Sequence, residues 1–140
     1  MITRDGLLVR REDWPERLES LIRARECVPF AWGTNDCALF AADAIYAMTD
    51  MDLARGYRGE YRTARGAARL LAELPGGLST VPSVVLMEIG FAYALRGDIV
   101  LFNGGNGQQL GVCIGEKFVA PGRVGLVAWS MSRALKAWRV

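Results

Sequence analysis

The stretch PFAWGTNDC, residues 29–37, runs directly into the apolar segment ALFAA, residues 38–42. A turn rich in Gly, Asn and Asp that precedes small and apolar residues predicts that a buried helix begins at Cys37. A cysteine in the first turn of a helix is close to free backbone N–H groups and to the positive end of the helix dipole, which lowers the pKa of a thiol. Cys37 therefore has the setting of a nucleophile.

No base accompanies this cysteine, because the sequence contains no histidine. A cysteine hydrolase needs a group that takes the thiol proton and later returns it to the leaving group. Asp36 is a poor substitute, since a carboxylate next to a thiol raises the thiol pKa by like-charge repulsion. Asp43 lies nearly two helical turns further on, and we expect it on a different face of the helix. The sequence thus contains half of a catalytic site.

The composition is that of one folded domain, which we place at residues 1–140. The chain is 51% hydrophobic and 23% charged, which is typical of a well-packed soluble fold. A net charge of +2, with arginines scattered along the chain, argues against a nucleic-acid partner. No apolar run reaches the roughly 18 residues of a membrane span, and residues 1–10 lack the apolar core of a secretory signal.

The three cysteines, Cys27, Cys37 and Cys113, form no closely spaced pair. A disulfide framework or a zinc site requires such pairs or histidines. We therefore expect reduced thiols, with Cys27 and Cys113 in structural roles, and neither a metal nor a cofactor. This pattern agrees with assembly in a cytoplasm.

Apolar residues at helical spacing predict helices in the first part of the chain, over residues 14–26, 37–48, 64–74 and, more briefly, from about 80 to 90. Asp13 and Glu16 form a capping box for the first helix, and Asp36 caps the second. Thr63 opens the third helix, and Ser79 or Thr80 caps the fourth.

The second helix is predicted to be the core helix, with four large side chains buried: Leu39, Phe40, Ile45 and Tyr46. The sequence pattern then becomes strand-like, and strands are predicted over residues 98–102, 109–114, 117–120 and 124–129. Ser132 is expected to cap a last helical turn. Helices followed by an antiparallel meander predict an α+β fold. The triplet RGD at residues 96–98 matches an adhesion motif, but it precedes an apolar strand, so we expect a turn that leads into that strand.

Three segments in this order resemble the NlpC-type cell-wall peptidases, a papain-like superfamily. FAWGTNDC at residues 30–37 resembles the family's aromatic-Gly-x-x-Asp-Cys nucleophile motif, and RGDIVLF at 96–102 resembles its Gly-Asp-hydrophobic strand. QLGVCIG at 109–115 resembles the strand that carries the family's catalytic histidine. The resemblance implies a papain-like fold, with the cysteine on the first turn of a central helix that packs on a C-terminal antiparallel sheet.

A compact subgroup encoded among phage and prophage tail genes gives the closest resemblance. Its members share PFAWG-x-x-D-C, a G-x-Y-x-T segment (here residues 59–63), the strand LGVCIG (residues 110–115) and a terminal WRV (residues 138–140). The resemblance implies a virion protein of the distal end of a long non-contractile tail, made in the host cytoplasm. The implied partners are other tail-tip proteins: the hub, the distal tail ring and the tape measure.

The chain departs from the peptidase pattern at Gln109, which stands where the family has its histidine. An amide does not accept a proton at neutral pH, so we expect Cys37 to be a vestigial nucleophile in a domain without enzymatic activity. A cleft could still be lined by Trp32, Gly33, Asp36, Cys37 and Gln109. Two alternatives remain: a Cys37-dependent cell-wall peptide hydrolase whose base comes from a partner chain, and a module that binds peptidoglycan peptides.

Overall fold

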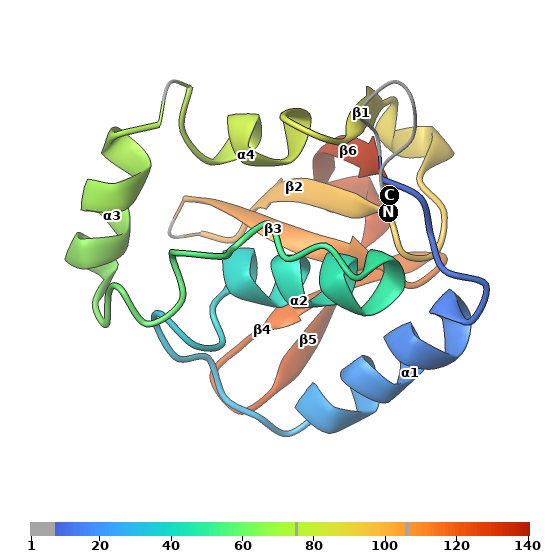
Figure 1. Ribbon diagram of the computed structural model, residues 1–140, viewed down its shortest axis with the longest axis horizontal. Coiled ribbons are helices and arrows are strands. Elements are labelled where there is room, and N and C mark those ends of the chain that lie inside the picture. The colour runs from blue at the N-terminus through green and yellow to red at the C-terminus, as the bar shows by residue number, and fades with distance from the viewer. Residues whose placement is uncertain (1–7, 75, 106) are drawn as a thin grey trace.

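A single six-stranded antiparallel sheet forms the centre of the protein, and helices cover one of its faces (Figure 1). The computed structural model describes residues 8–74, 76–105 and 107–140. The strand order is β1-β6-β2-β3-β4-β5, so the last strand in sequence pairs inside the sheet. The strands are β1 (Met87–Ile89), β2 (Ile99–Asn103), β3 (Gln108–Cys113), β4 (Lys117–Pro121), β5 (Leu126–Ser130) and β6 (Ala134–Arg139).

Four α-helices precede the sheet's main strands, which confirms the predicted α+β class. They are α1 (Trp14–Arg25), α2 (Cys37–Thr49), α3 (Ala64–Ala72) and the single turn α4 (Thr80–Ser83). As predicted, α2 begins at Cys37, and the Thr63 hydroxyl caps α3 by accepting from the Gly66 N–H. No helix in the described ranges is long and apolar enough to cross a bilayer.

The helix α2 is the core helix, as its small and apolar sequence predicts. Phe40, Ala44 and Ile45 are buried against the strands and against α1. On the sheet side they meet Ile99 and Leu101 of β2 and further buried residues of β3 and β6: Leu110, Val112 and Trp138. The expected burial of Tyr46 is wrong, because this side chain is 48% exposed. It lies on the helix face that turns toward solvent beside α1.

The other face of the sheet holds a second cluster built on aromatic rings. Side chains alternate along β2, so Ile99 and Leu101 face α2 while Val100 and Phe102 face the second cluster. The Phe102 and Phe118 rings lie 4.7 Å apart, and Trp129 lies 5.0 Å from Phe102. The central strands are therefore buried on both sides.

Three local predictions are wrong. Asp13 does not cap α1, since its carboxylate accepts instead from Arg11. The fourth helix is a single turn whose N-cap residue Ser79 makes no capping bond, and the following segment forms strand β1 instead of a helix. After a short 3₁₀ turn, in which Ser130 rather than Ser132 supplies the accepting hydroxyl, the last segment is strand β6.

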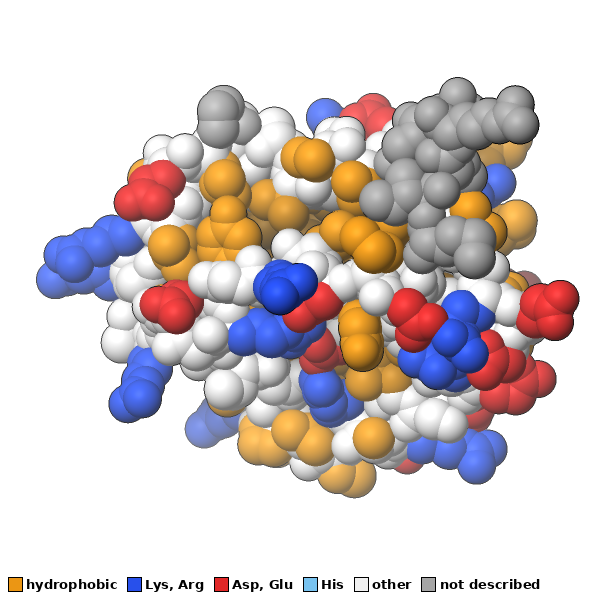
Figure 2. Space-filling model, viewed as in Figure 1, with side chains coloured by type: hydrophobic (Ala, Val, Ile, Leu, Met, Phe, Trp, Pro, Cys, Tyr) orange, Lys and Arg blue, Asp and Glu red, His pale blue; other side chains and the backbone are white. Residues whose placement is uncertain are grey.

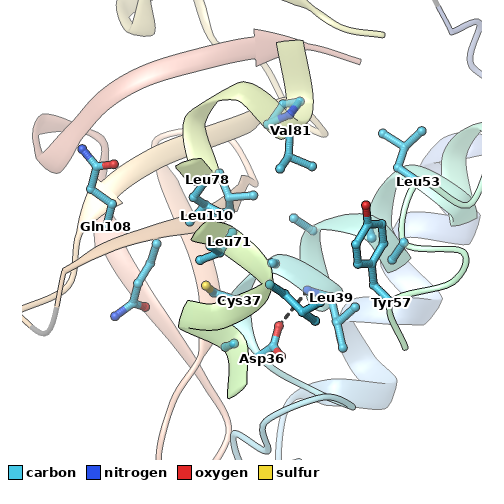
Figure 3. A pocket seen from close by; sticks show the side chains of 18 of the residues that line it. Asp36, Cys37, Leu39, Leu53, Tyr57, Leu71, Leu78, Val81, Gln108 and Leu110 are labelled. Carbon is cyan, nitrogen blue, oxygen red and sulfur yellow. Dashed lines mark hydrogen bonds between the residues drawn. The ribbon is translucent and has the colours of Figure 1, made fainter. Parts of the chain in front are cut away.

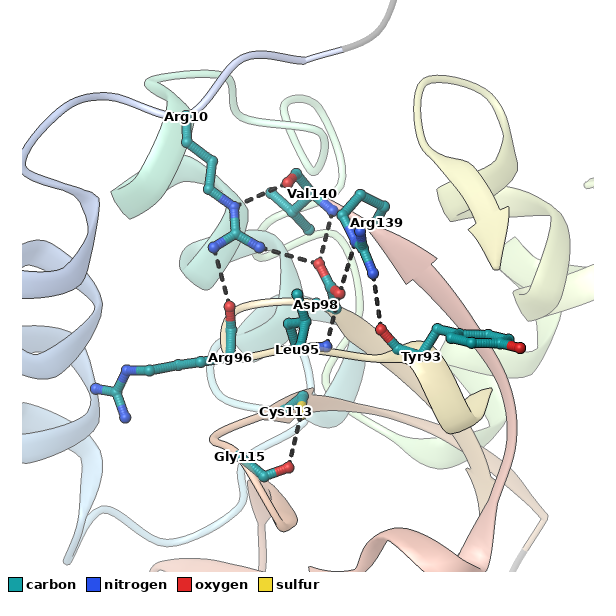
Figure 4. A network of polar contacts seen from close by, with 9 residues as sticks. All are labelled: Arg10, Tyr93, Leu95, Arg96, Asp98, Cys113, Gly115, Arg139 and Val140. Atoms are coloured by element: carbon teal, nitrogen blue, oxygen red, sulfur yellow. Dashed lines mark hydrogen bonds and ion pairs between the residues drawn. The ribbon is translucent and has the colours of Figure 1, made fainter. Parts of the chain in front are cut away.

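The RGD triplet forms the predicted turn, and its aspartate is inaccessible. Asp98 is 0% exposed and accepts hydrogen bonds from the guanidinium groups of Arg10 and Arg139 and from the backbone N–H groups of Leu95 and Val140 (Figure 4). Because the carboxylate is enclosed by these donors, it is unavailable to an adhesion receptor. It joins segments from both halves of the sequence instead.

Candidate functional site

The turn before α2 is organised by the Asp36 side chain, which is 1% exposed. One carboxylate oxygen accepts from the Leu39 N–H at 2.9 Å and caps the helix, as predicted. The other accepts from the Gly33 N–H at 2.9 Å and from the Tyr61 hydroxyl. Asp36 therefore fixes the position of Cys37 at the helix start (Figure 3).

Gly33 allows residues 59–61 to lie directly on this turn. It adopts φ +81°, a left-handed conformation that favours glycine. A Cβ at this position would lie 1.9 Å from the Tyr61 carbonyl oxygen, and the Gly59 N–H donates to the Gly33 carbonyl at 2.9 Å. Gly33, which we predicted as a cleft residue, thus allows residues 59–61 to pack against the turn that precedes Cys37.

Asn35 and Arg25 hold the turn from the other side. The Asn35 amide donates to the carbonyls of Val28 and Pro29 and accepts from Arg25. Arg25 also pairs with Asp43 at 2.7 Å, as does Arg58. Asp43 is thus engaged by two arginines away from Cys37, which agrees with its predicted placement on a different helix face.

The Cys37 thiol is buried, and this overturns the predicted lowering of its pKa. The side chain belongs to a residue that is 9% exposed, and burial is the main cause that raises the thiol pKa to about 11. The adjacent Asp36 carboxylate raises it further, while backbone hydrogen bonds, the largest from Leu110, lower it only in part. The helix start stabilises a thiolate less than the loss of water destabilises it.

Gln109 lines the same cavity as Cys37 and is half-buried. The preceding side chain, Gln108, points away from Cys37 (Figure 3). A Cβ built on Gly104 would lie 2.2 Å from the Gln109 amide nitrogen, so this amide rests against the backbone of the β2–β3 hairpin. Within the described residues, no hydrogen bond connects the Gln109 and Cys37 side chains. Among the described residues, the only carboxylate that perturbs the thiol is that of Asp36, which already accepts three hydrogen bonds.

Four of the five predicted cleft residues, Trp32, Asp36, Cys37 and Gln109, line one cavity of about 1320 Å³. Trp32 is 38% exposed at its edge and packs edge-to-face on Phe30, with ring centroids 4.7 Å apart. The described residues contain no cluster of His, Cys, Asp and Glu that could hold a metal ion.

The far wall of this cavity was not predicted. It is apolar and comes from α3, α4 and the loop after α2, with side chains such as Leu53, Tyr57, Leu71, Leu78 and Val81. The apolar spacing in residues 64–74 signals one buried face of α3, but it does not say what that face meets. Only the folded chain shows that it faces the cavity.

Comparison with solved structures supports the papain-like architecture. The chain is similar to the NlpC/p60 domain of the peptidoglycan hydrolase SagA, with a TM-score of 0.57 and 15% identity over 91% of this chain and 96% of that one. At this identity the likeness establishes the fold alone. Comparison with curated protein sequences gives no match. A family model described as "Domain of unknown function (DUF6950)" matches residues 9–140. Since that match spans nearly the whole sequence, the chain belongs to the DUF6950 family, on an NlpC/p60-like fold.

Proposed function

We propose that this protein is a catalytically inactive NlpC/p60-like domain that serves as a structural and binding component of a phage tail tip. The observation that carries the first half of the proposal is the absence of a base beside Cys37. By its sequence resemblance to the NlpC-type peptidases, Gln109 stands where those peptidases have their histidine, and the sequence contains no histidine. A protonated thiol is a weak nucleophile, and loss of the base from a covalent mechanism removes many powers of ten in rate.

The polar groups around Cys37 do not replace that base. Asp36 already accepts three hydrogen bonds. Tyr61 donates its hydroxyl proton to Asp36, and burial together with that bond raises the pKa of Tyr61. A phenol with a raised pKa does not take a proton from a thiol at neutral pH. These groups stabilise the turn and leave the thiol protonated.

The motifs shared with the phage-tail subgroup support the second half of the proposal, because they make scaffold contacts. Tyr61 of the G-x-Y-x-T segment binds Asp36. In the terminal WRV, Trp138 is fully buried and donates to Ser83, Arg139 pairs with Asp98, and the Val140 N–H donates to Asp98. These motif residues, by which the sequence resembles the phage-tail subgroup, maintain the scaffold, and this is compatible with a component of an assembly.

The reactivity of Cys37 can be tested against an internal control. Cys27 is a free and exposed cysteine in the same chain. We expect iodoacetamide at pH 7 to label Cys27 at least a hundredfold faster than Cys37, as measured by peptide mass spectrometry over time. The purified protein should release no product from peptidoglycan peptides. Turnover that Cys37→Ala abolishes and Cys27→Ala preserves would overturn the proposal in favour of a hydrolase.

The assembly role has a separate test. Tail particles produced by the bacterium that encodes the chain should contain it at a fixed ratio to the other tail-tip proteins, and chemical cross-links should connect it to the hub, the distal tail ring or the tape measure. Particles that lack the chain but retain complete tips would contradict the assembly role. Saturable binding of a peptidoglycan peptide by the purified chain would favour a cell-wall-binding module instead.

A further inference from the structure

The cavity next to Cys37 is larger and more apolar than an inactive peptidase cleft requires. Its volume of about 1320 Å³ exceeds the roughly 300–1,000 Å³ of common small-molecule sites. Figure 2 shows hydrophobic side chains exposed on the viewed face between α3 and α4. Contiguous apolar surface of this kind marks a binding site in a soluble protein.

One wall of the cavity is the inner face of α3. Ala64, Ala67, Ala68 and Leu71 recur at helical spacing and all line the cavity, whereas Ala72 on the same helix does not. The opposite wall is the first half of α2, including Leu39 and Ala42. Because both walls are apolar, the space between them suits a long hydrocarbon chain.

The charged side chains of the lining, Asp36 and Arg123, lie toward one end of this space, whereas Tyr57 lies beside Leu53 at the other end (Figure 3) and Thr80 also lines the cavity. Cys37 and Asp36 lie at one side of the cavity, and Leu53 and Val81 lie at the other (Figure 3). The turn that carries Arg123 meets the Cys37 end, because the Phe30 N–H donates to the Gly122 carbonyl at 2.8 Å. Arg123 is exposed, lines the cavity and forms no ion pair with another described residue.

An open apolar cavity whose described lining residues include one cationic side chain, Arg123, is complementary to an anionic amphiphile. We propose that this cavity binds a long straight acyl chain, with the hydrocarbon between α2 and α3 and a carboxylate or phosphate head beside Arg123 and Gln109. A peptide segment would need partners for its backbone N–H and C=O groups, and the apolar walls offer few. The inference does not depend on whether Cys37 reacts or on the assembly role.

The test is a chain-length series measured with the purified protein by isothermal titration calorimetry, from octanoate through laurate to palmitate and stearate. Because each buried methylene strengthens binding by up to about fourfold, affinity should rise steeply along the series and then level off once the cavity is filled. Absence of saturable palmitate binding below its critical micelle concentration, or affinity independent of chain length, would overturn the proposal.

Matched variants locate the ligand. Ala68→Trp fills the cavity from α3 and should weaken palmitate binding at least tenfold, whereas Ala72→Trp, an exposed alanine of the same helix outside the cavity, should leave it unchanged. Arg123→Gln should weaken palmitate by about fivefold and leave the uncharged palmityl alcohol unaffected, with Arg69→Gln as its control. Thermal melts establish that each variant folds. Equal losses in Ala68→Trp and Ala72→Trp would refute the cavity as the site.

Two binding experiments, one with lipid vesicles and one with free palmitate, distinguish the sources of the acyl chain. If the protein sediments with phosphatidylglycerol vesicles and Ala68→Trp abolishes this co-sedimentation, the ligand is a membrane lipid. Palmitate binding without vesicle binding would assign a free fatty acid.

Discussion

Asp36 and Asp98 are both fully buried aspartates, but their negative charges are stabilised in opposite ways. Asp98 accepts from the guanidinium groups of Arg10 and Arg139 as well as from two backbone N–H groups. Asp36 accepts only from neutral donors: two backbone N–H groups and the Tyr61 hydroxyl. Asp98 is paired with cations from distant parts of the chain, whereas Asp36, next to Cys37, has no cationic partner among the described residues.

This difference separates two roles, because the Asp98 carboxylate binds cations from distant segments whereas the Asp36 carboxylate organises a local turn. Arg10 also donates to the carbonyls of Arg96 and Val140 and stacks over Trp14, so the Asp98 network ties four segments together. At the other site, the charge on Asp36 adds to burial in raising the pKa of the Cys37 thiol. A neighbouring cation lowers the pKa of a thiol, whereas the Asp36 carboxylate next to Cys37 raises it.

The largest expected effect comes from removal of the charge on Asp98. Asp98→Asn leaves the Arg10 guanidinium, which is largely buried, without its counter-charge, and it should lower the free energy of unfolding by about 3–5 kcal/mol. Urea denaturation followed by circular dichroism measures this loss. The matched control is Asp50→Asn, whose carboxylate pairs with Arg11 and Arg17 at the surface and should cost at most about 1 kcal/mol. Equal losses in the two variants would contradict the assigned role of Asp98.

The next effect is a loss of stability at high pH that originates at Cys37. Burial raises the pKa of its thiol from the ordinary 9.0 to about 11, so the folded state retains a proton that the unfolded state has released. The stabilisation is fully present below about pH 9 and disappears as the pH rises through 11, a change of about 3 kcal/mol. The stability difference between the wild type and Cys37→Ala, from urea titrations at pH 8 and above pH 11, should shrink by that amount. A difference that stays constant with pH would mean that the thiol is not buried in solution.

Asp36→Asn should have a smaller effect than Asp98→Asn. Asparagine caps helices as well as aspartate does, so the bond to the Leu39 N–H survives while the bond to the Gly33 N–H is lost. We expect a cost of about 1–2 kcal/mol, measured by the same urea titration. A loss of unfolding free energy as large as that of Asp98→Asn would show that a cation also pairs with Asp36. The two aspartates would then not differ in how their charges are stabilised.

Tyr61→Phe should have the smallest effect. It removes one hydrogen bond to Asp36 and should cost about 1 kcal/mol. A double-mutant cycle with Asp36→Ala, which removes both carboxylate oxygens, isolates the coupling between the two side chains. Additive losses in that cycle would show that the hydroxyl does not bind Asp36 in solution.

Much of the fold can be predicted from short sequence patterns, and the predictions that fail have a common cause. The helix that begins at Cys37, its Asp36 cap and the strands β2 to β5 all follow from local sequence. Strands β1 and β6 do not. β6 consists of residues ALKAWR, which favour helices as single residues, and the register shift opposite Leu101 and Phe102 breaks its alternation. Long-range pairing overrides the local preference there.

Only the Cys37 side of the candidate site could be predicted from the sequence. The stretch of residues 29–37 locates Cys37 at the start of α2, and the sequence shows that no histidine is available as a base. The pKa of Cys37 could not be predicted, because it depends on burial by strands far along the chain. The apolar wall also escaped prediction, since spacing identifies the inner face of α3 without showing that it faces a cavity.

The position of β6 between β1 and β2 has a consequence for synthesis. β1 leaves the ribosome before its partner β6 exists, whereas β2 to β5 can pair with one another as they emerge. Until β6 inserts, β2 presents an unpaired apolar edge, which is a template for association with other nascent chains. The order of the strands therefore makes β6, which is translated after the other described strands of the sheet, the segment that ends this aggregation-prone interval.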